Sequence, residues 1–422
     1  MKTRKHRKEY DIIIVGAGIA GLHSAYLLLK EDPSLDILIC EKYKTIGGRI
    51  QTKHVQFNGT ELLFEAGAGR FHTQQHRLMN LIDELGLASS IQKIDSSFSF
   101  YDIHSEPSSV STKLVVGKLL AYGKLCSTTY LQNHSLLQMA NYILTTSETE
   151  LLVGSFGYYT ELVQMNAYDA MTLILNNLNP LLQFCILKGG LSQLIDALKD
   201  RMPTVTLQCT EILDIQEYSR GFRCISKQKT FFGKKCICAL PRPQLQKFKL
   251  FSTMTMLNKI TCAPLCRIYS VFREPWNKHL PKLTTNNNLR MVITGTTQKG
   301  LTTLMTSYTD NHYAKFWKRL YELGNHTFDL VHPELVRLLR ETTHLNVPMP
   351  LQSYLYYWEC GVGYWGIGAD SAKIARKMVK PFPNKDLFVC GEHYSATNQQ
   401  WMEGALETSE QVVMKILKLN VT

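Results

Sequence analysis

The sequence predicts an α/β fold in which a parallel-sheet domain is interleaved with an α+β domain. Two glycine-marked stretches at opposite ends of the chain predict the parallel sheet: apolar runs at 12–15 and 387–390 lead into glycines at 16 and 391. Short apolar runs of this kind are typical of buried parallel strands. Helical periodicity at 136–144 and 171–181 and alternation at 267–272 predict a helical cap and a mixed sheet in the second domain.

The turn after the first run has glycine where a dinucleotide-binding turn needs it. Gly16 permits the tight turn, Gly18 lets the backbone approach a pyrophosphate, and Gly21 lets the next helix pack closely. The helix predicted from Ala20 to Lys30 would point its first amide groups at the phosphates. These residues predict a Rossmann-like dinucleotide site.

The residues just beyond narrow the choice of dinucleotide. A strand predicted at 36–40 precedes Glu41, whose carboxylate would accept hydrogen bonds from a ribose and repel a 2′-phosphate, which argues against NADP. Lys42 follows, and Gly48 with Arg49 forms a second turn whose guanidinium could donate to the pyrophosphate. This combination indicates FAD, although Arg49 taken alone could be a solvated loop residue.

The combined motifs resemble the flavin-containing amine oxidases, a group that includes monoamine, polyamine and L-amino-acid oxidases. They are GAGIAG at 16–21, GGR at 47–49, EAGAGRF at 65–71, GEHYS at 391–395 and QWMEGAL at 400–406. Segments 88–180 and 277–350 resemble the family only loosely. The resemblance implies FAD contacts at Gly16, Gly18, Ala20, Gly21, Glu41, Lys42, Gly48, Arg49, Gly67, Ala68, Gly69, Arg70, Glu211, Gly391, Glu392, Trp401 and Met402. It also implies an FAD-binding domain made of 1–75, 181–265 and 355–422 and a substrate domain made of 76–180 and 266–354.

By the same resemblance, two aromatic walls would hold an amine against the flavin. Trp365 and Trp401 would face each other there, in a dry pocket that orients the reacting carbon–hydrogen bond; core tryptophans are the alternative. Aromatic faces attract an approaching cationic amine by about 0.5–2 kcal/mol. Tyr364, assigned to substrate binding, stands where covalently flavinylated monoamine oxidases have cysteine, which predicts non-covalent FAD.

Two arginines complete the expected site. Arg267 stands where most of these oxidases have a lysine that reaches flavin N5 through water; it keeps the positive charge but is never a base. Arg70 fits the pattern by which L-amino-acid oxidases hold the substrate carboxylate, and packing in the flavin domain is the alternative. The role of Arg267 in reoxidation by oxygen stays open.

The resulting hypothesis is an FAD-dependent oxidoreductase. It would oxidise an amine or L-amino acid by hydride transfer to flavin N5, giving an imine, and molecular oxygen would accept the electrons to give hydrogen peroxide. Two alternatives remain open: a flavin desaturase or dehydrogenase resembling protoporphyrinogen oxidase, and an FAD-binding protein without turnover.

Composition sets the remaining expectations. The 422 residues carry a formal charge of +12 without an arginine-rich stripe, so a nucleic-acid partner is not expected. No apolar run approaches the roughly 18 residues that span a bilayer, and we expect no membrane anchor.

Eleven scattered cysteines indicate reduced thiols in a cytoplasmic chain, with neither a disulfide framework nor a metal site. The basic segment 2–8 is expected to be a solvated tail, with a nuclear address as the alternative.

Overall fold

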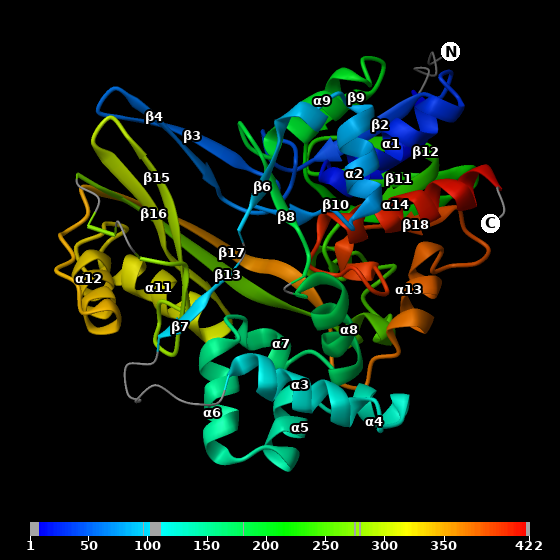
Figure 1. Cartoon of the computed structure of the whole chain (residues 1–422). Helices are drawn as coiled ribbons and strands as arrows, with labels where there is room; N and C mark the ends of the chain where they lie inside the picture. Colours follow the sequence, from blue (N-terminus) through cyan, green and yellow to red (C-terminus); the bar gives the residue numbers. More distant parts are fainter. Residues whose placement is uncertain are drawn as a thin grey trace, which may run out of the picture.

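The computed structural model describes residues 8–95, 97–101, 111–179, 181–273, 276–277 and 280–418. Figure 1 shows a sheet with its covering helices at the upper right, a second sheet at the left, and a lobe of short helices below both. The predicted fold class is confirmed. The assignment of segments to two domains stays a prediction, and most of the basic segment 2–8 lies outside the described residues.

The first sheet has seven strands in the order β10-β11-β12-β1-β2-β9, and β18 pairs with β12. β1 runs parallel to β2 and β12, β2 runs parallel to β9, and β12 runs parallel to β18. The strands are β1 (Glu9–Val15), β2 (Ile37–Glu41), β9 (Thr206–Cys209), β10 (Ile212–Tyr218), β11 (Gly221–Ser226), β12 (Thr230–Cys238) and β18 (Leu387–Val389).

Helices cover both faces of this sheet. On one face α1, α2, α9 and α14 share a core with Ile12, Ile14 and Ile39. On the other, α10 and α13 pack over Ile13, Leu38 and Cys236. The helices are α1 (Ile19–Glu31), α2 (His76–Glu84), α9 (Ser192–Asp200), α10 (Arg242–Leu245), α13 (Ser371–Val379) and α14 (Met402–Leu417). The continuous apolar run of β1 reflects burial on both faces.

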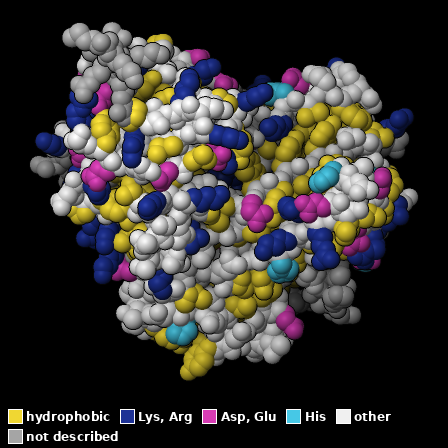
Figure 2. Space-filling view, turned by 180° about the vertical axis from the view of Figure 1, so that it is seen from behind, with side chains coloured by type: hydrophobic (Ala, Val, Ile, Leu, Met, Phe, Trp, Pro, Cys, Tyr) yellow, Lys and Arg dark blue, Asp and Glu magenta, His cyan; other side chains and the backbone are white. Residues whose placement is uncertain are grey.

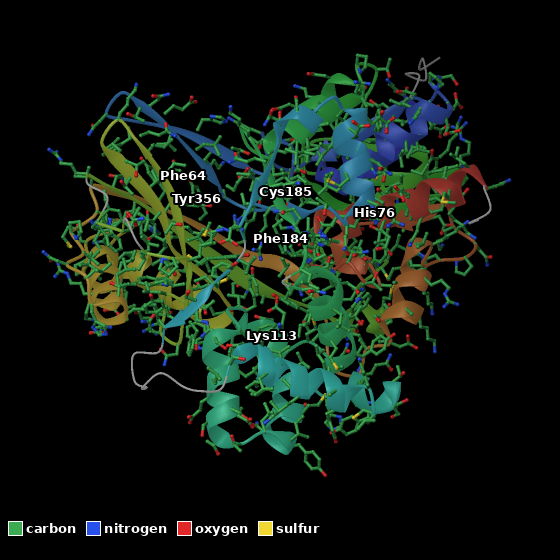
Figure 3. All side chains as sticks on the ribbon, in the orientation of Figure 1. Phe64, His76, Lys113, Phe184, Cys185 and Tyr356 are labelled. Carbon is green, nitrogen blue, oxygen red and sulfur yellow. A yellow bond between two sulfur atoms is a disulfide. The ribbon has the colours of Figure 1, made fainter. Side chains whose placement is uncertain are left out.

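The second sheet has six strands in the order β17-β13-β16-β15-β14-β7. They are β7 (Ser99–Tyr101), β13 (Ile260–Phe272), β14 (Leu283–Thr285), β15 (Met291–Gln298), β16 (Leu301–Asp310) and β17 (Gln352–Trp365). Helices α11 (Asn311–Leu323) and α12 (Val331–Thr343) share a core with β13. The hairpin of β3 (Thr52–Phe57) and β4 (Thr60–Glu65) packs on other side chains of the sheet, and Figure 3 shows Phe64 beside Tyr356 there.

The helical lobe contains α3 (Thr112–Gly123), α4 (Thr128–Gln132), α5 (Leu136–Ile143), α6 (Thr146–Ser155), α7 (Tyr159–Val163) and α8 (Ala167–Asn177). The helix expected at 171–181 begins four residues earlier, because the side chain of Asn166 accepts the Asp169 amide and caps it there. A small sheet of β5 (Phe71–His72), β8 (Phe184–Leu187) and β6 (Ile91–Ile94) completes the fold, together with 3-10 helices at Ala88–Ser90, Thr255–Lys259 and Glu392–Tyr394.

The expectation that all cysteines are reduced is wrong for one pair. Cys262 on β13 and Cys360 on β17 form a disulfide, with their Cα atoms 5.3 Å apart. They lie 98 residues apart in sequence and meet only because β13 and β17 are antiparallel neighbours, so no local spacing could reveal the pairing. The other nine cysteines are free.

Within the described part of the chain, no helix is both long and apolar enough to cross a membrane. On the face in Figure 2, Lys and Arg side chains are dispersed among acidic and hydrophobic ones.

Candidate functional site

The two glycine-marked ends meet at the edge of the seven-stranded sheet where its parallel strands end; the pairs β10–β11 and β11–β12 of this sheet are antiparallel. β12 lies between β1 and β18, and the three strands run in the same direction, so the turns at Gly16 and Gly391 emerge together. Backbone hydrogen bonds continue past the strand ends, from Ala239 to Val15 at 2.8 Å and from Cys390 to Cys238 at 3.1 Å. The carboxyl edge of such a sheet is where ligands of this fold class bind.

Some glycines of these turns are required by close packing within the protein, and others have no close protein neighbour. A Cβ at Gly16 would lie 2.5 Å from the Ala239 carbonyl oxygen, and a Cβ at Gly21 would lie 2.1 Å from the Gly16 carbonyl oxygen, so packing within the protein explains both. A Cβ at Gly18 would meet nothing nearer than 4.0 Å, although the φ of −73° suits any residue. A Cβ at Gly391 would likewise meet nothing nearer than 3.7 Å. Gly18 therefore leaves space for a ligand, not for protein.

Two helices begin at this edge without a side-chain cap. The N-cap residues of α1 and α14 are Gly18 and Trp401, and no side chain in the described part of the chain caps either helix start. Ala20 and Met402 lie in the first turns, where amide groups have no partner inside the helix. Such helix starts favour phosphate oxygens or developing negative charge.

Glu41 lies at the end of β2, as expected for a ribose acceptor. Its Oε2 accepts the Ala17 amide at 2.9 Å and its Oε1 accepts the Tyr43 amide at 3.1 Å, which orients the carboxylate toward the glycine turn. A cavity of about 480 Å³ opens beside Glu41 and is also lined by Tyr43 and Cys209. Lys42 and Glu211 are both exposed at this end.

Arg49 links the two ends of the chain. Its Nη1 donates to Glu392 Oε1 at 2.6 Å and to the Gly361 carbonyl oxygen at 2.9 Å. A Cβ at Gly48 would come within 3.2 Å of the Gly18 Cα, and a Cβ at Gly67 within 1.9 Å of the Arg49 carbonyl oxygen. The next residue, Ala68, donates its amide to the same Arg49 oxygen at 2.9 Å. The motif blocks around 18, 48, 67 and 392 thus form one contiguous unit.

Glu392 is held as a buried carboxylate. It accepts the Gly363 amide at 3.1 Å and the Gln400 amide at 2.8 Å, and His393 Nε2 lies 3.1 Å from its Oε1. Burial alone would raise the pKa of Glu392, but His393, Arg49 and the Gln400 amide hold that pKa well below its usual range. These contacts give Glu392 a positioning role between β17 and the start of α14.

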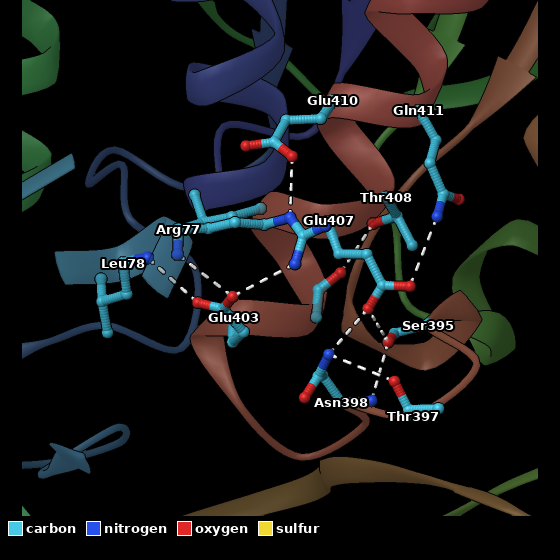
Figure 4. Close-up of polar contacts among 12 residues, drawn as sticks. Arg77, Leu78, Ser395, Thr397, Asn398, Glu403, Glu407, Thr408, Glu410 and Gln411 are labelled. Atoms are coloured by element: carbon cyan, nitrogen blue, oxygen red, sulfur yellow. Dashed lines mark hydrogen bonds and ion pairs between the residues drawn. The ribbon is translucent and has the colours of Figure 1, made fainter. Parts of the chain in front are cut away.

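Carboxylates also fix the start of α14, as Figure 4 shows. Glu403 accepts the Arg77 and Leu78 amides at 3.2 and 3.0 Å, and Arg77 Nε donates to Glu410 at 2.7 Å. Glu407 accepts the Ser395 hydroxyl at 2.6 Å. The positions of Trp401 and Met402 therefore depend on α2 and on the loop before α14.

The aromatic residues are arranged differently from the expected pair. Trp365 is buried in the core beneath the parallel sheet, and its Nε1 donates to the Ser395 carbonyl oxygen at 2.9 Å. Tyr364, one residue earlier on β17, faces the helical lobe, and Trp401 packs against the same cluster. The ring of Trp401 also contacts His72 and Phe184, with centroids 5.6 and 6.2 Å away. Trp401 therefore shares its cluster with Tyr364, not with Trp365, because neighbouring strand residues point to opposite faces.

The two arginines lie among tyrosines. Arg267 Nη1 donates to the Glu65 carbonyl oxygen at 2.9 Å, and its guanidinium lies 4.5 Å from the ring centre of Tyr308. Gly69 makes room for it, since a Cβ there would be 2.9 Å from Nη1. Burial alone would lower the pKa of Arg267, but Tyr308 and Tyr269 raise it, and the side chain stays charged.

Arg70 lies close to the aromatic cluster. Its guanidinium stacks over Phe184 at 4.5 Å, and Nη2 donates to the Tyr158 hydroxyl at 3.2 Å. Burial raises the pKa of Tyr158 to about 12, so this hydroxyl stays protonated. Figure 3 shows Phe184 near the middle of the molecule. Phe184, Tyr158 and Tyr308 were missed by sequence reasoning, since they lie in or near the loosely matched segments and carry no motif.

Two family models match this chain. Residues 14–85 match the NAD(P)-binding Rossmann-like domain, and residues 130–417 match the flavin containing amine oxidoreductase family. The coproporphyrinogen III oxidase of Staphylococcus aureus is 32% identical over 81 residues, which cover 19% of this chain and 16% of that protein. The flavin-dependent L-tryptophan oxidase of Lentzea aerocolonigenes is 31% identical over 97 residues, which cover 23% of this chain and 20% of that protein. The matched segments thus span about a fifth or less of these relatives.

Solved structures extend the likeness to the whole fold. A putrescine oxidase bound to putrescine superposes with a TM-score of 0.76 at 16% identity, over 98% of this chain and 100% of the other. Cyclohexylamine oxidase from Brevibacterium oxydans gives a TM-score of 0.76 at 15% identity, over 97% and 99% of the two chains. Since the family match covers well over half of the sequence, this chain belongs to the flavin containing amine oxidoreductases, and its cofactor is FAD.

Proposed function

We propose that this chain binds FAD non-covalently and oxidises an amine, including L-α-amino acids, to an imine, with molecular oxygen as the electron acceptor. The observation that carries the proposal is the convergence of Tyr364 and Trp401 in one cluster beside the Arg49–Glu392 pair. When bound, FAD supplies the hydride acceptor. The product imine would hydrolyse to a carbonyl compound, and hydrogen peroxide would form.

The residues that would hold FAD come from both ends of the chain. The turn at Gly18 and the start of α1 would take the pyrophosphate, and Glu41 the ribose. Among the residues that the structure describes, Arg49 hydrogen-bonds through Nη1 alone, so its other N–H groups could donate to a phosphate. The uncapped start of α14 at Met402 would stabilise negative charge on the flavin ring.

The substrate would lie between Tyr364 and Trp401. Their rings exclude water and attract the cationic amine before it loses its proton. We place Tyr364 in this pair instead of Trp365, because Tyr364 shares a cluster with Trp401, whereas Trp365, which is equally buried, lies on the opposite face of β17. Arg267 would keep positive charge near the reacting centre, since its guanidinium is confined between Glu65 and Tyr308.

Arg70 supports an α-amino acid as substrate. The ring of Phe184 contacts both the Arg70 guanidinium and the Trp401 ring, so Arg70 lies close to the proposed substrate pocket. A carboxylate beside the reacting carbon of a substrate could therefore reach the Arg70 guanidinium. Charge-assisted hydrogen bonds of this kind are worth about 1.5–3 kcal/mol, or roughly 10- to 150-fold in rate. Arg70→Ala should therefore lower kcat/KM for an L-amino acid by this factor and leave the matching decarboxylated amine nearly unaffected. Equal losses for both substrates would assign Arg70 to packing.

An anaerobic screen tests the proposal as a whole. The FAD-loaded protein is mixed with amines and L-amino acids while the visible flavin absorbance is followed, and loss of colour identifies a reducing substrate. Readmission of oxygen, with a peroxide assay, then tests the electron acceptor.

A second candidate is dehydrogenation of a ring substrate. It is supported by Arg267, which replaces the lysine usual in amine oxidases, and by the likeness to a coproporphyrinogen oxidase. Bleaching by a reduced porphyrin but by no amine would favour it. A protein that none of these compounds bleaches would instead support FAD binding without turnover.

A further inference from the structure

The Cys262–Cys360 disulfide is accessible and lies next to the residues proposed to hold FAD. Both cysteines are only partly buried, and the disulfide joins β13 to β17 where their pairing register shifts, between Ala263 and Leu265. One disulfide among nine free cysteines is not the framework of a disulfide-stabilised domain. In reducing compartments, the disulfides that do occur are usually transient and catalytic or redox-sensing.

The two sulfur atoms have different surroundings. His393 Nε2 lies 3.7 Å from Cys360 Sγ, while His393 Nδ1 accepts the Arg242 amide at 3.2 Å. Because Nδ1 is an acceptor, the neutral ring carries its proton on Nε2, the nitrogen that faces Cys360. Among the described residues, Cys262 has no comparable N–H neighbour. The same Nε2 lies 3.1 Å from Glu392 Oε1, so Cys360 shares this N–H with a carboxylate. The shared donor still gives a thiolate at Cys360 a hydrogen-bond partner that a thiolate at Cys262 lacks.

Cys360 is also directly connected to the proposed cofactor contacts. The next residue, Gly361, accepts Arg49 through its carbonyl oxygen, and Gly363 donates its amide to Glu392. His393 bridges the two groups, since its Nε2 contacts both Cys360 and Glu392. The disulfide thus anchors the segment of β17 that positions Arg49 and Glu392.

We propose that Cys262–Cys360 is a thiol–disulfide exchange site that is opened by a dithiol reductant, and that opening it weakens FAD binding. One thiolate of the reductant attacks the Cys262 sulfur, the Cys262–Cys360 bond breaks, and Cys360 leaves as a thiolate stabilised by His393. The second thiolate of the reductant then attacks the mixed disulfide and releases Cys262. The reductant ends as a disulfide, and its two protons pass to the two protein thiols.

Alkylation tests the direction of exchange. The folded, FAD-loaded protein is treated with dithiothreitol at pH 7 and pulsed with iodoacetamide, and labelling at each cysteine is measured by peptide mass spectrometry. Cys360 should be labelled several-fold faster than Cys262, and His393→Asn should remove the difference. Equal labelling in the unaltered protein, or a disulfide that opens only with global unfolding, would overturn the proposal, and so would faster labelling at Cys262.

FAD titration tests the consequence. Quenching of FAD fluorescence should give a several-fold larger Kd for the reduced protein than for the oxidised protein. The double variant Cys262→Ser with Cys360→Ser should match the reduced protein and ignore dithiothreitol. Cys126→Ser, in the helical lobe, should behave as the unaltered protein. Equal Kd values in the two redox states would reject the coupling. Cysteine labelling and FAD binding are measured without amine turnover, so their results test this proposal independently of the proposed oxidase activity.

Discussion

Trp365 and Trp401 carry the same side chain in opposite environments. Trp365 is almost fully buried with its indole nitrogen hydrogen-bonded, whereas Trp401 is half-buried at the start of α14. Trp401→Ala should therefore slow flavin reduction by the substrate while FAD stays bound, because it removes one wall of the proposed pocket. Stopped-flow absorbance measures that rate.

Trp365→Ala is the matched comparison. It should cost about 3–5 kcal/mol of unfolding free energy, as large-to-small changes in a packed core do. Urea unfolding followed by circular dichroism measures this loss. If Trp401→Ala reduced the flavin at the normal rate, the aromatic-pair hypothesis would be wrong.

Gly18 and Gly21 offer a second matched pair. A methyl group at Gly18 would make only an ordinary contact, 4.0 Å from the Gly48 Cα, so Gly18→Ala should leave the Tm of the FAD-free protein nearly unchanged and weaken FAD binding. A methyl group at Gly21 would lie 2.1 Å from the Gly16 carbonyl oxygen. That clash outweighs the gain of about 1 kcal/mol that alanine brings to a helix, so Gly21→Ala should lower the Tm itself. Calorimetric FAD titration and thermal melts separate the two effects.

At the scale of elements, α1 and α14 are joined by a buried histidine. His23 Nδ1 lies 2.7 Å from Ser409 Oγ, and burial lowers the pKa of His23 from 6.5 to about 4. The unfolded chain therefore binds a proton below pH 6.5 that the folded protein does not bind. The stability that this group contributes is complete above pH 6.5 and is lost as the pH falls toward 4.

We expect the free energy of unfolding to fall by about 2 kcal/mol from this group between pH 7 and pH 5. His23→Gln, which does not titrate, should lack this part of the decline. Urea unfolding of both proteins at the two pH values checks it. Parallel pH profiles would show that folding does not lower the pKa of His23.

The elements with strong local signals could be predicted from the sequence, and those set by distant contacts could not. α1 and β2 lie within a residue of their expected bounds, because apolar runs and glycines determine them locally. The side of β17 on which Trp365 lies depends on its register with β13, and the Cys262–Cys360 pair depends on the same register. The tyrosines around Arg70 and Arg267 come from the lobe and the second sheet, where no local pattern marks them.

At the scale of the whole molecule, the proposed FAD site depends on both ends of the chain. Glu41 and Gly18 precede residue 50, whereas Glu392 and Met402 follow residue 390. The Arg49–Glu392 pair is one of the contacts that join the two ends. A ligand that spans both groups should stabilise the fold more than either half of it. A ligand that binds only the folded state adds about 2.7 kcal/mol at 100 times its Kd.

Titration of the FAD-free protein should therefore raise the Tm most with FAD and less with FMN or ADP at equal concentration. FMN lacks the adenosine that would reach Glu41, and ADP lacks the flavin that would reach Met402. FMN and ADP added together should still stabilise the protein less than FAD does. Two separate ligands lose translational and rotational entropy twice on binding, whereas FAD loses it once. Differential scanning fluorimetry measures the three shifts. If FMN alone raised the Tm as much as FAD does, the turn at Gly18 would have no part in binding. The meeting of the two chain ends would then not be explained by FAD binding.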